Sequence, residues 1–192
     1  DHIIQRSEFL TSYTPYQPEI TQGTLQYLFE FQTQVSQLTG MAVANASMYD
    51  GSTATAEAVL MAHRVTRKSR AVLSGRLHPH YTAVVENISD MGGFAVAQAE
   101  MAPTGAEDLL ALIDDDTSCV VVQNPDFFGN VADFSALAKA VQEKGAVSMT
   151  AASTLPMSLL SSAKARATQD YRAVVCVLLA GGADSFNILV PR

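Results

Sequence analysis

Several residue types are scarce in this chain of 192 residues, and each scarcity excludes a class of protein. The two cysteines, Cys119 and Cys176, are too few for a disulfide framework or a cysteine-rich zinc module. Basic residues number 12 against 19 acidic ones, so the net charge is -7 and binding to nucleic acid through its phosphates is not expected. No apolar run reaches about 18 residues, so no membrane-spanning helix is predicted. A secretory signal and an initiator Met are both missing at the N-terminus, which predicts a processed, cut or incomplete chain.

Lysine is scarce as well, and none of the four lysines has the setting of a Schiff-base lysine. Lys68 precedes a predicted strand, and Lys164 follows an apolar segment. Lys139 and Lys144 belong to an amphipathic helix and its end. The P-loop spacing and the Gly-x-Ser-x-Gly elbow are also absent from the sequence, which argues against a P-loop protein and a standard α/β-hydrolase.

Hydrophobic residues make up 48% of the chain, as in a globular protein. Periodicity predicts helices over residues 24–39, 53–64, 78–88, 104–113 and 134–141, and strands over 71–74, 94–99, 119–123 and 146–150. Alternating strands and helices imply an α/β fold with a mostly parallel sheet.

A turn joins the buried stretch before Asn45 to the helix that follows, with Asp50 or Ser52 as its cap. Free backbone N–H groups at such a helix start favour an anion, Gly51 permits close approach, and Ser52 and Thr53 add hydroxyls. The turn is therefore a candidate phosphate or carboxylate cradle. An ordinary capped helix start is the alternative, and spacing alone favours it.

Two other loops follow predicted strands. The imidazoles of His78 and His80 lie where α/β sheets bind ligands and could stack on a planar cofactor, or they belong to a solvated surface loop. No Cys or Glu at ligand spacing supports a zinc site there. The loop 123–129 either lines the same crevice or forms a tight turn over two aromatic side chains.

Composition changes near residue 145. Residues 1–144 carry 8 basic and 17 acidic side chains, whereas residues 145–163 are small, apolar and uncharged. Lys164-Ala165-Arg166-Ala167 follows, which gives the layout of a signal-peptide core and cleavage site. A buried strand, a turn at Pro156 and a short helix are the alternative that the pattern alone favours.

Several motifs together resemble the glycine decarboxylase P-protein family of the glycine cleavage system, in its subunit 1 (alpha) form. They are FLTSYTPYQPEITQGT at 9–24, LTGM at 38–41, NASMYDG at 45–51, AEA at 56–58, HP at 78–79 and QNPDFFG at 123–129. The match is collinear over about residues 1–146.

The resemblance implies part of the large domain of a type I pyridoxal-phosphate fold, as in aspartate aminotransferase. The family decarboxylates glycine and passes the aminomethyl group to lipoyl H-protein. Pyridoxal phosphate would be held mainly by a beta subunit that carries the lysine, so this chain is expected to lack independent catalysis and catalytic residues. Its expected partners are the beta subunit, H-protein and glycine, in the cytoplasm.

The resemblance also suggests which residues face the cofactor. The cofactor-binding candidates are Asn45, Ser47, Asp50, Gly51, Ser52 and Thr53, with His78 at the ring-stacking position. Tyr16, Gln17, Glu19 and Gln22 would line the crevice. The sequence departs from the family after Ala146, because residues 151–156 lack the carboxylate expected to face the pyridine nitrogen.

The end of the chain resembles the start of an exported bacterial domain family of unknown function, related to alkaline phosphatases. In that family Asp184 would inherit a metal-binding position. The sequence therefore predicts a composite: a P-protein part over 1–146, a signal-like segment over 147–167 and part of an exported domain over 168–192. Two alternatives remain open, a non-catalytic module that docks the beta subunit and the start of a metal-dependent exported hydrolase.

Overall fold

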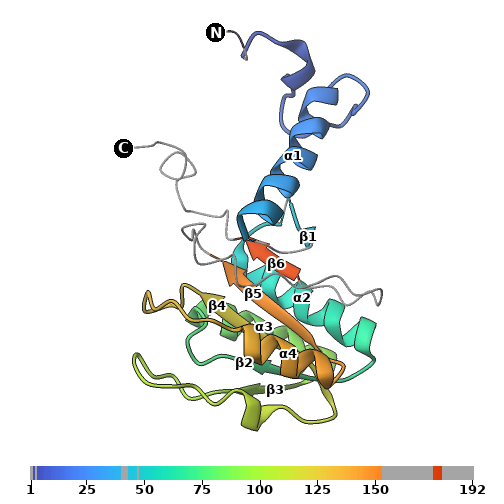
Figure 1. Ribbon diagram of the computed structural model, residues 1–192. Helices are drawn as coiled ribbons and strands as arrows, with labels where there is room; N and C mark the ends of the chain where they lie inside the picture. The colour runs from blue at the N-terminus through green and yellow to red at the C-terminus, as the bar shows by residue number, and fades with distance from the viewer. Residues whose placement is uncertain (1, 3, 40–42, 47, 153–174, 179–192) are drawn as a thin grey trace.

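A single parallel sheet organises the protein (Figure 1). The computed structural model describes residues 2, 4–39, 43–46, 48–152 and 175–178. The sheet order is β1-β6-β5-β4-β2-β3, and every neighbouring pair is parallel. Its strands are β1 (Val43–Ala44), β2 (Arg70–Leu73), β3 (Ala95–Gln98), β4 (Thr117–Asn124), β5 (Val147–Ala152) and β6 (Val175–Leu178). The predicted α/β class with a parallel sheet is confirmed.

Helices cover both faces of this sheet (Figure 1). They are α1 (Gln22–Thr39), α2 (Gly51–Thr66), α3 (Pro79–Gly92) and α4 (Ser135–Glu143), with short 3-10 turns η1 (Ser7–Phe9) and η2 (Leu110–Leu112). Helices α2 and α3 pack on one face, and α4 and η2 pack on the other. None of the helices in the described part of the chain is long and apolar enough to span a membrane.

Strand β4 shows why its sequence is a continuous apolar run. Cys119 and Val121 join the cluster under α2 and α3, whereas Val120 and Val122 join the cluster under α4. Both faces of the strand are therefore buried, as expected for a parallel strand between two helical layers.

The predicted helix over 104–113 is wrong, because only the 3-10 turn η2 forms there. The Arg76 guanidinium donates to the carbonyls of Ala102, at 3.0 Å, and Gly105, and Gly105 has a φ of 99°. The bond to Gly105 takes a carbonyl that a helix over 104–113 would use for itself, and a positive φ does not fit a right-handed helix. Sequence periodicity carries no information about such bonds.

The region after Ala146 begins with a strand. Strand β5 pairs with β4 from Cys119↔Val147 to Asn124↔Ala152, as in the strand interpretation of the apolar segment. Strand β6 lies between β5 and β1. Residues 153–174 and 179–192 are outside the described residues, so the signal-like and exported segments stay predictions.

Candidate functional site

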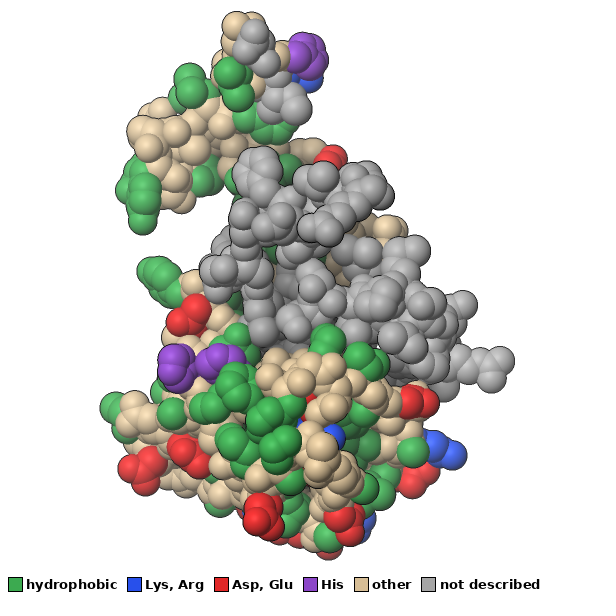
Figure 2. Space-filling view, turned by 90° about the vertical axis from the view of Figure 1, so that its left-hand side faces the viewer, with side chains coloured by type: hydrophobic (Ala, Val, Ile, Leu, Met, Phe, Trp, Pro, Cys, Tyr) green, Lys and Arg blue, Asp and Glu red, His purple; other side chains and the backbone are tan. Residues whose placement is uncertain are grey.

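Two predicted site regions meet at the carboxyl edge, where the parallel strands end. His78 follows β2, and its backbone N–H donates to the Gln123 side chain of β4 at 2.9 Å. The His78 ring contacts Tyr81 at 4.9 Å and Phe127 at 5.1 Å between centroids. The 123–129 loop thus lies beside His78, as expected if both face one crevice. Figure 2 shows two neighbouring histidines bordering hydrophobic side chains on this face.

His78 is held as the N-cap of α3. Its Nδ1 accepts from the His80 N–H at 3.2 Å, and Pro79 starts the helix. Burial and then the neighbouring His80 lower the pKa of His78, which favours the neutral ring. A neutral, half-buried imidazole is suited to stacking, but its described ring neighbours are protein aromatics. The stacking role stays a prediction.

The start of α2 forms the predicted cradle, and its donors are already engaged. The Asp50 carboxylate accepts from the Thr53 backbone N–H and from the Thr53 hydroxyl, each at 2.7 Å. It also accepts from the Ser52 hydroxyl at 2.9 Å. Bonds from Thr53 and then Ser52 lower the pKa of Asp50, so its carboxylate is ionised at neutral pH. Asp50 is thus the cap, one of the two candidates that the sequence offered, and its negative charge lies where an external anion would bind.

The remaining cradle candidates contribute little in this arrangement. The Asn45 side chain is exposed and accepts from the next backbone N–H, of Ala46, at 2.7 Å. Gly51 is buried at the first position of α2. Ser47 lies outside the described residues.

The other predicted group, Tyr16, Gln17, Glu19 and Gln22, lies elsewhere. These exposed residues precede or begin α1, at the end of that helix far from the sheet (Figure 1). An α-helix of 18 residues is about 27 Å long. The structure therefore does not bring this group together with Asp50 or His78 within one chain. Their proposed role in lining a crevice stays a prediction.

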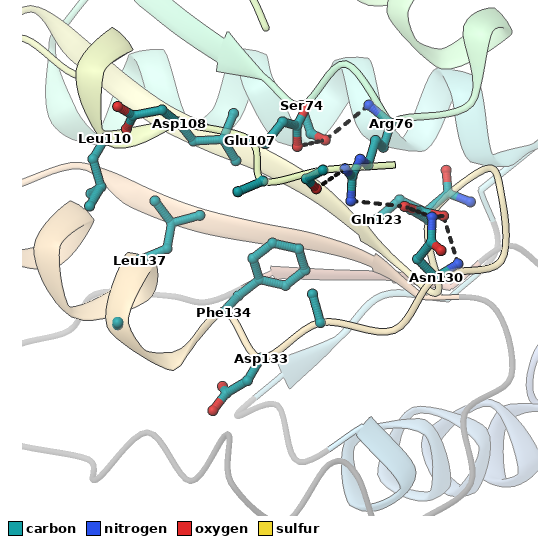
Figure 3. Close-up of a pocket in the computed structure, with 16 residues that line it drawn as sticks. Ser74, Arg76, Glu107, Asp108, Leu110, Gln123, Asn130, Asp133, Phe134 and Leu137 are labelled. Atoms are coloured by element: carbon teal, nitrogen blue, oxygen red, sulfur yellow. Dashed lines mark hydrogen bonds and ion pairs between the residues drawn. The ribbon is translucent and has the colours of Figure 1, made fainter. Parts of the chain in front are cut away.

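A cleft of about 330 Å³, which the sequence did not indicate, opens on the α4 side of the carboxyl edge. Figure 3 shows Ser74, Arg76 and Asn130 on its polar side and Leu110, Phe134 and Leu137 on its apolar side. The Glu107 carboxylate accepts from the Ser74 hydroxyl at 2.7 Å. Gln123 and Asp126 of the loop 123–129, which the sequence offered as lining a crevice, also line this cleft.

Two charged groups of the cleft, Arg76 and Asp126, are paired with each other. The Arg76 guanidinium lies 3.6 Å from the Asp126 carboxylate, which also accepts from the backbone N–H groups of Phe128 and Asn130. Arg76 further bonds the loop carbonyls at 102 and 105. This network links three loops to one another. Its geometry is that of a set of contacts that orders these loops and not that of a ligand-binding site.

The residues at the α2 start do not fit the phosphate of pyridoxal phosphate. The hydroxyls of Ser52 and Thr53 and one backbone N–H are bonded to the Asp50 carboxylate, and that negative charge would repel a second anion. The predicted pyridoxal-phosphate cradle is therefore capped from within the chain.

Comparison with known proteins decides the family. A sequence model described as glycine cleavage system P-protein matches residues 1–171. The chain belongs to this family. The match extends the resemblance beyond residue 146, into the segment predicted to be signal-like.

Curated relatives of this P-protein chain carry a subunit name. "Probable glycine dehydrogenase (decarboxylating) subunit 1" of Xanthobacter autotrophicus is 66% identical over 147 residues. The protein of the same name from Methylocella silvestris is 67% identical over 147 residues. Each alignment covers 77% of this chain and 33% of the relative, so the chain spans about a third of the relatives' length.

Solved structures confirm the type I pyridoxal-phosphate fold. Glycine decarboxylase (P-protein) of the glycine cleavage system, in inhibitor-bound form, is 37% identical with a TM-score of 0.69. The match covers 83% of this chain and 38% of that one. An aromatic amino acid aminotransferase shares the fold at 14% identity, with a TM-score of 0.61 over 93% of this chain and 48% of that one. These findings give no support to a docking module or an exported hydrolase.

Proposed function

We propose that this chain acts as the subunit 1 part of a two-subunit glycine decarboxylase and performs no catalysis alone. In this proposal a second subunit holds pyridoxal phosphate on its own lysine. The assembly then removes the carboxylate of glycine and transfers the aminomethyl group to lipoyl H-protein in the cytoplasm. This chain supplies part of the frame and interface of that assembly.

One observation carries the non-catalytic role: the described lysines all lie away from the carboxyl edge. Lys68 precedes β2, and its Nζ donates to the Lys144 carbonyl at 2.7 Å. Lys144 precedes β5, and its Nζ lies 3.3 Å from the Asp115 carboxylate. Lys139 is exposed on α4. A Schiff-base lysine must reach the ligand site, which parallel sheets place at the other edge.

The N-terminal arm, residues 4–20, supports the need for a partner. It stands clear of the sheet with α1 and exposes Tyr13 by 85% and Tyr16 by 75% (Figures 1 and 2). Its turns are fixed by hydrogen bonds such as Tyr16 N–H to the Thr14 carbonyl at 2.7 Å. Exposed aromatic side chains on a surface with fixed turns are typical of protein interfaces.

The test is copurification with a P-protein subunit 2, followed by glycine–bicarbonate exchange with H-protein. We expect a complex, and activity only in the mixture. The chain alone and subunit 2 alone are the controls. A complex that fails to form, or exchange by this chain alone, would overturn the proposal.

The role of the arm can be tested within the same assay. Replacing both Tyr13 and Tyr16 by Ser is expected to weaken the complex at least about tenfold, since aromatic interface residues carry much of the binding energy. Met91→Ser is the matched control, because Met91 is 81% exposed on α3. Equal affinity of the arm variant and the control would place the interface elsewhere.

The end of the chain is part of the same proposal. We propose that residues 179–192 are not needed for association, whether or not they derive from an exported domain, and that Asp184 binds no metal in this protein. A chain ending at Leu178, which keeps β6 between β5 and β1, should still copurify. Loss of the complex on this truncation would contradict the proposal.

A further inference from the structure

We infer that the Asp50 carboxylate occupies the place at the start of α2 where an external anion would bind. This chain therefore excludes phosphate-bearing ligands from that place. The inference rests on the proposed function and deepens it, because it explains why the partner and not this chain would bind pyridoxal phosphate. It concerns one side chain and does not depend on where the partner binds.

The donor geometry carries the inference. A phosphate at a helix start is held by first-turn N–H groups and nearby hydroxyls. Here the Ser52 hydroxyl, the Thr53 hydroxyl and the Thr53 N–H all converge on the Asp50 carboxylate, at 2.7 to 2.9 Å. One carboxylate therefore takes the place that a phosphate group would occupy.

The helix start is held rigidly around this carboxylate. The Thr55 hydroxyl donates to the Gly51 carbonyl at 2.6 Å, and the Ala54 N–H donates to the Asp50 carbonyl at 3.0 Å. Ser52 and Thr55 are buried. The three donors are thus already aimed at one point, and only the Asp50 side chain has to leave for an external anion to enter.

The negative charge of Asp50 also reaches the aromatic group at the start of α3. Burial and then the Asp50 charge raise the pKa of Tyr81, whose ring contacts His78. The rings that could face a planar cofactor therefore lie within the field of a carboxylate. Removal of that charge would favour an anionic ligand both at the start of α2 and beside the rings of His78 and Tyr81.

Asp50→Ser provides the direct test. Serine is an equally good N-cap, so α2 should still begin at the same residue, while the charge is lost and the hydroxyls are released. The probe is pyridoxine 5′-phosphate, which lacks the aldehyde that reacts with lysines. Unphosphorylated pyridoxine isolates the contribution of the phosphate. We expect the variant to bind the phosphorylated probe at least about tenfold more tightly than wild type in equilibrium dialysis.

Asp133→Ser is the matched control, just before α4. The Asp133 carboxylate also accepts from a backbone N–H and a hydroxyl, both of Ser135, but outside the predicted cradle. We expect no gain in binding from it. If Asp50→Ser fails to fold, Asp50→Asn carries the same test, since it removes the charge with little change in size.

Two results would overturn the inference. One is wild-type binding of the phosphorylated probe as tight as that of the Asp50 variants. The other is folded Asp50 variants that bind no better than the Asp133 control. Neither depends on subunit 2, and we expect Asp50→Ser to copurify with it as wild type does. A failed complex and a failed phosphate assay therefore report on different claims.

Discussion

His63 is a titratable side chain that is buried in the core. It is 3% exposed and stacks on Phe94 with 4.3 Å between ring centroids. Its Nδ1 lies 3.1 Å from the Lys68 carbonyl and so carries the proton, while Nε2 has no hydrogen-bond partner among the described residues. Burial lowers the pKa of His63, and the Lys68 carbonyl and the Asp116 charge oppose that effect.

Acid is therefore expected to destabilise the protein through His63. The unfolded chain takes up a proton at the ordinary pKa near 6.5, whereas the folded chain resists it. The stabilising contribution is complete above that pKa and is lost as the pH falls towards the lowered folded value. Denaturant unfolding at about pH 7.5 and about pH 5.5 should show this loss.

His63→Phe should reduce this pH dependence, because phenylalanine keeps the ring stack and cannot titrate. His2→Gln serves as the control, since His2 is exposed near the N-terminus. Equal pH dependence in wild type and His63→Phe would contradict the assignment.

Gly75 is required by close backbone approach at the end of β2. A Cβ atom there would lie 2.6 Å from the Ala99 carbonyl oxygen, which belongs to the backbone and has little room to move. Gly75→Ala is expected to cost about 2 to 4 kcal/mol of unfolding free energy. At Gly92 the atom that a Cβ would meet belongs to the Phe94 ring. Gly92→Ala should therefore lower the unfolding free energy by less, and thermal melts of both variants measure the difference.

At the scale of elements, periodicity predicted the structure wherever an element buries one continuous face. Helices α1, α2, α3 and α4 and the strands of the core all lie close to their expected positions. The helix cap was narrowed to Asp50 or Ser52 from the sequence, because a cap is a local interaction, and the structure shows that it is Asp50. The segment 104–113 failed because its conformation depends on Arg76, almost thirty residues earlier in the chain. The cleft was missed for the same reason.

The loop between β3 and β4 should depend on Arg76. Arg76→Gln removes the bonds to two loop carbonyls and leaves the Asp126 carboxylate, 5% exposed, without its cation. We expect a loss of about 2 kcal/mol and faster amide hydrogen exchange across residues 100–108. Arg64→Gln is the control, because Arg64 is exposed on α2. Unchanged exchange in this loop would show that its order has another source.

For the whole molecule, the distribution of exposed apolar side chains is uneven. Large apolar residues are exposed along the arm and α1, among them Tyr13, Tyr16, Ile20 and Phe29. The sequence showed the family motif at 9–24 but not how far it lies from the carboxyl edge. That distance follows from the direction in which α1 leaves the sheet (Figure 1).

The isolated chain is therefore expected to self-associate as its concentration rises, and subunit 2 should suppress this by covering the arm. Light scattering over a concentration series measures the effect. The arm variant with both tyrosines replaced should self-associate less than Met91→Ser. A monomer at every concentration would contradict the expectation.

The position of β6 also bears on how the chain is made. Val43 of β1 pairs with Val175 of β6, and β1 reaches the rest of the sheet only through that strand in the described structure. A ribosome delivers β1 well before β6, which follows it by more than a hundred residues. Synthesis at about 5 to 20 residues per second leaves α1 and β1 waiting for seconds without their neighbour. Chaperones therefore have a defined window in which to meet the segment with α1 and β1, and the window closes once β6 has left the ribosome and can pair with β1.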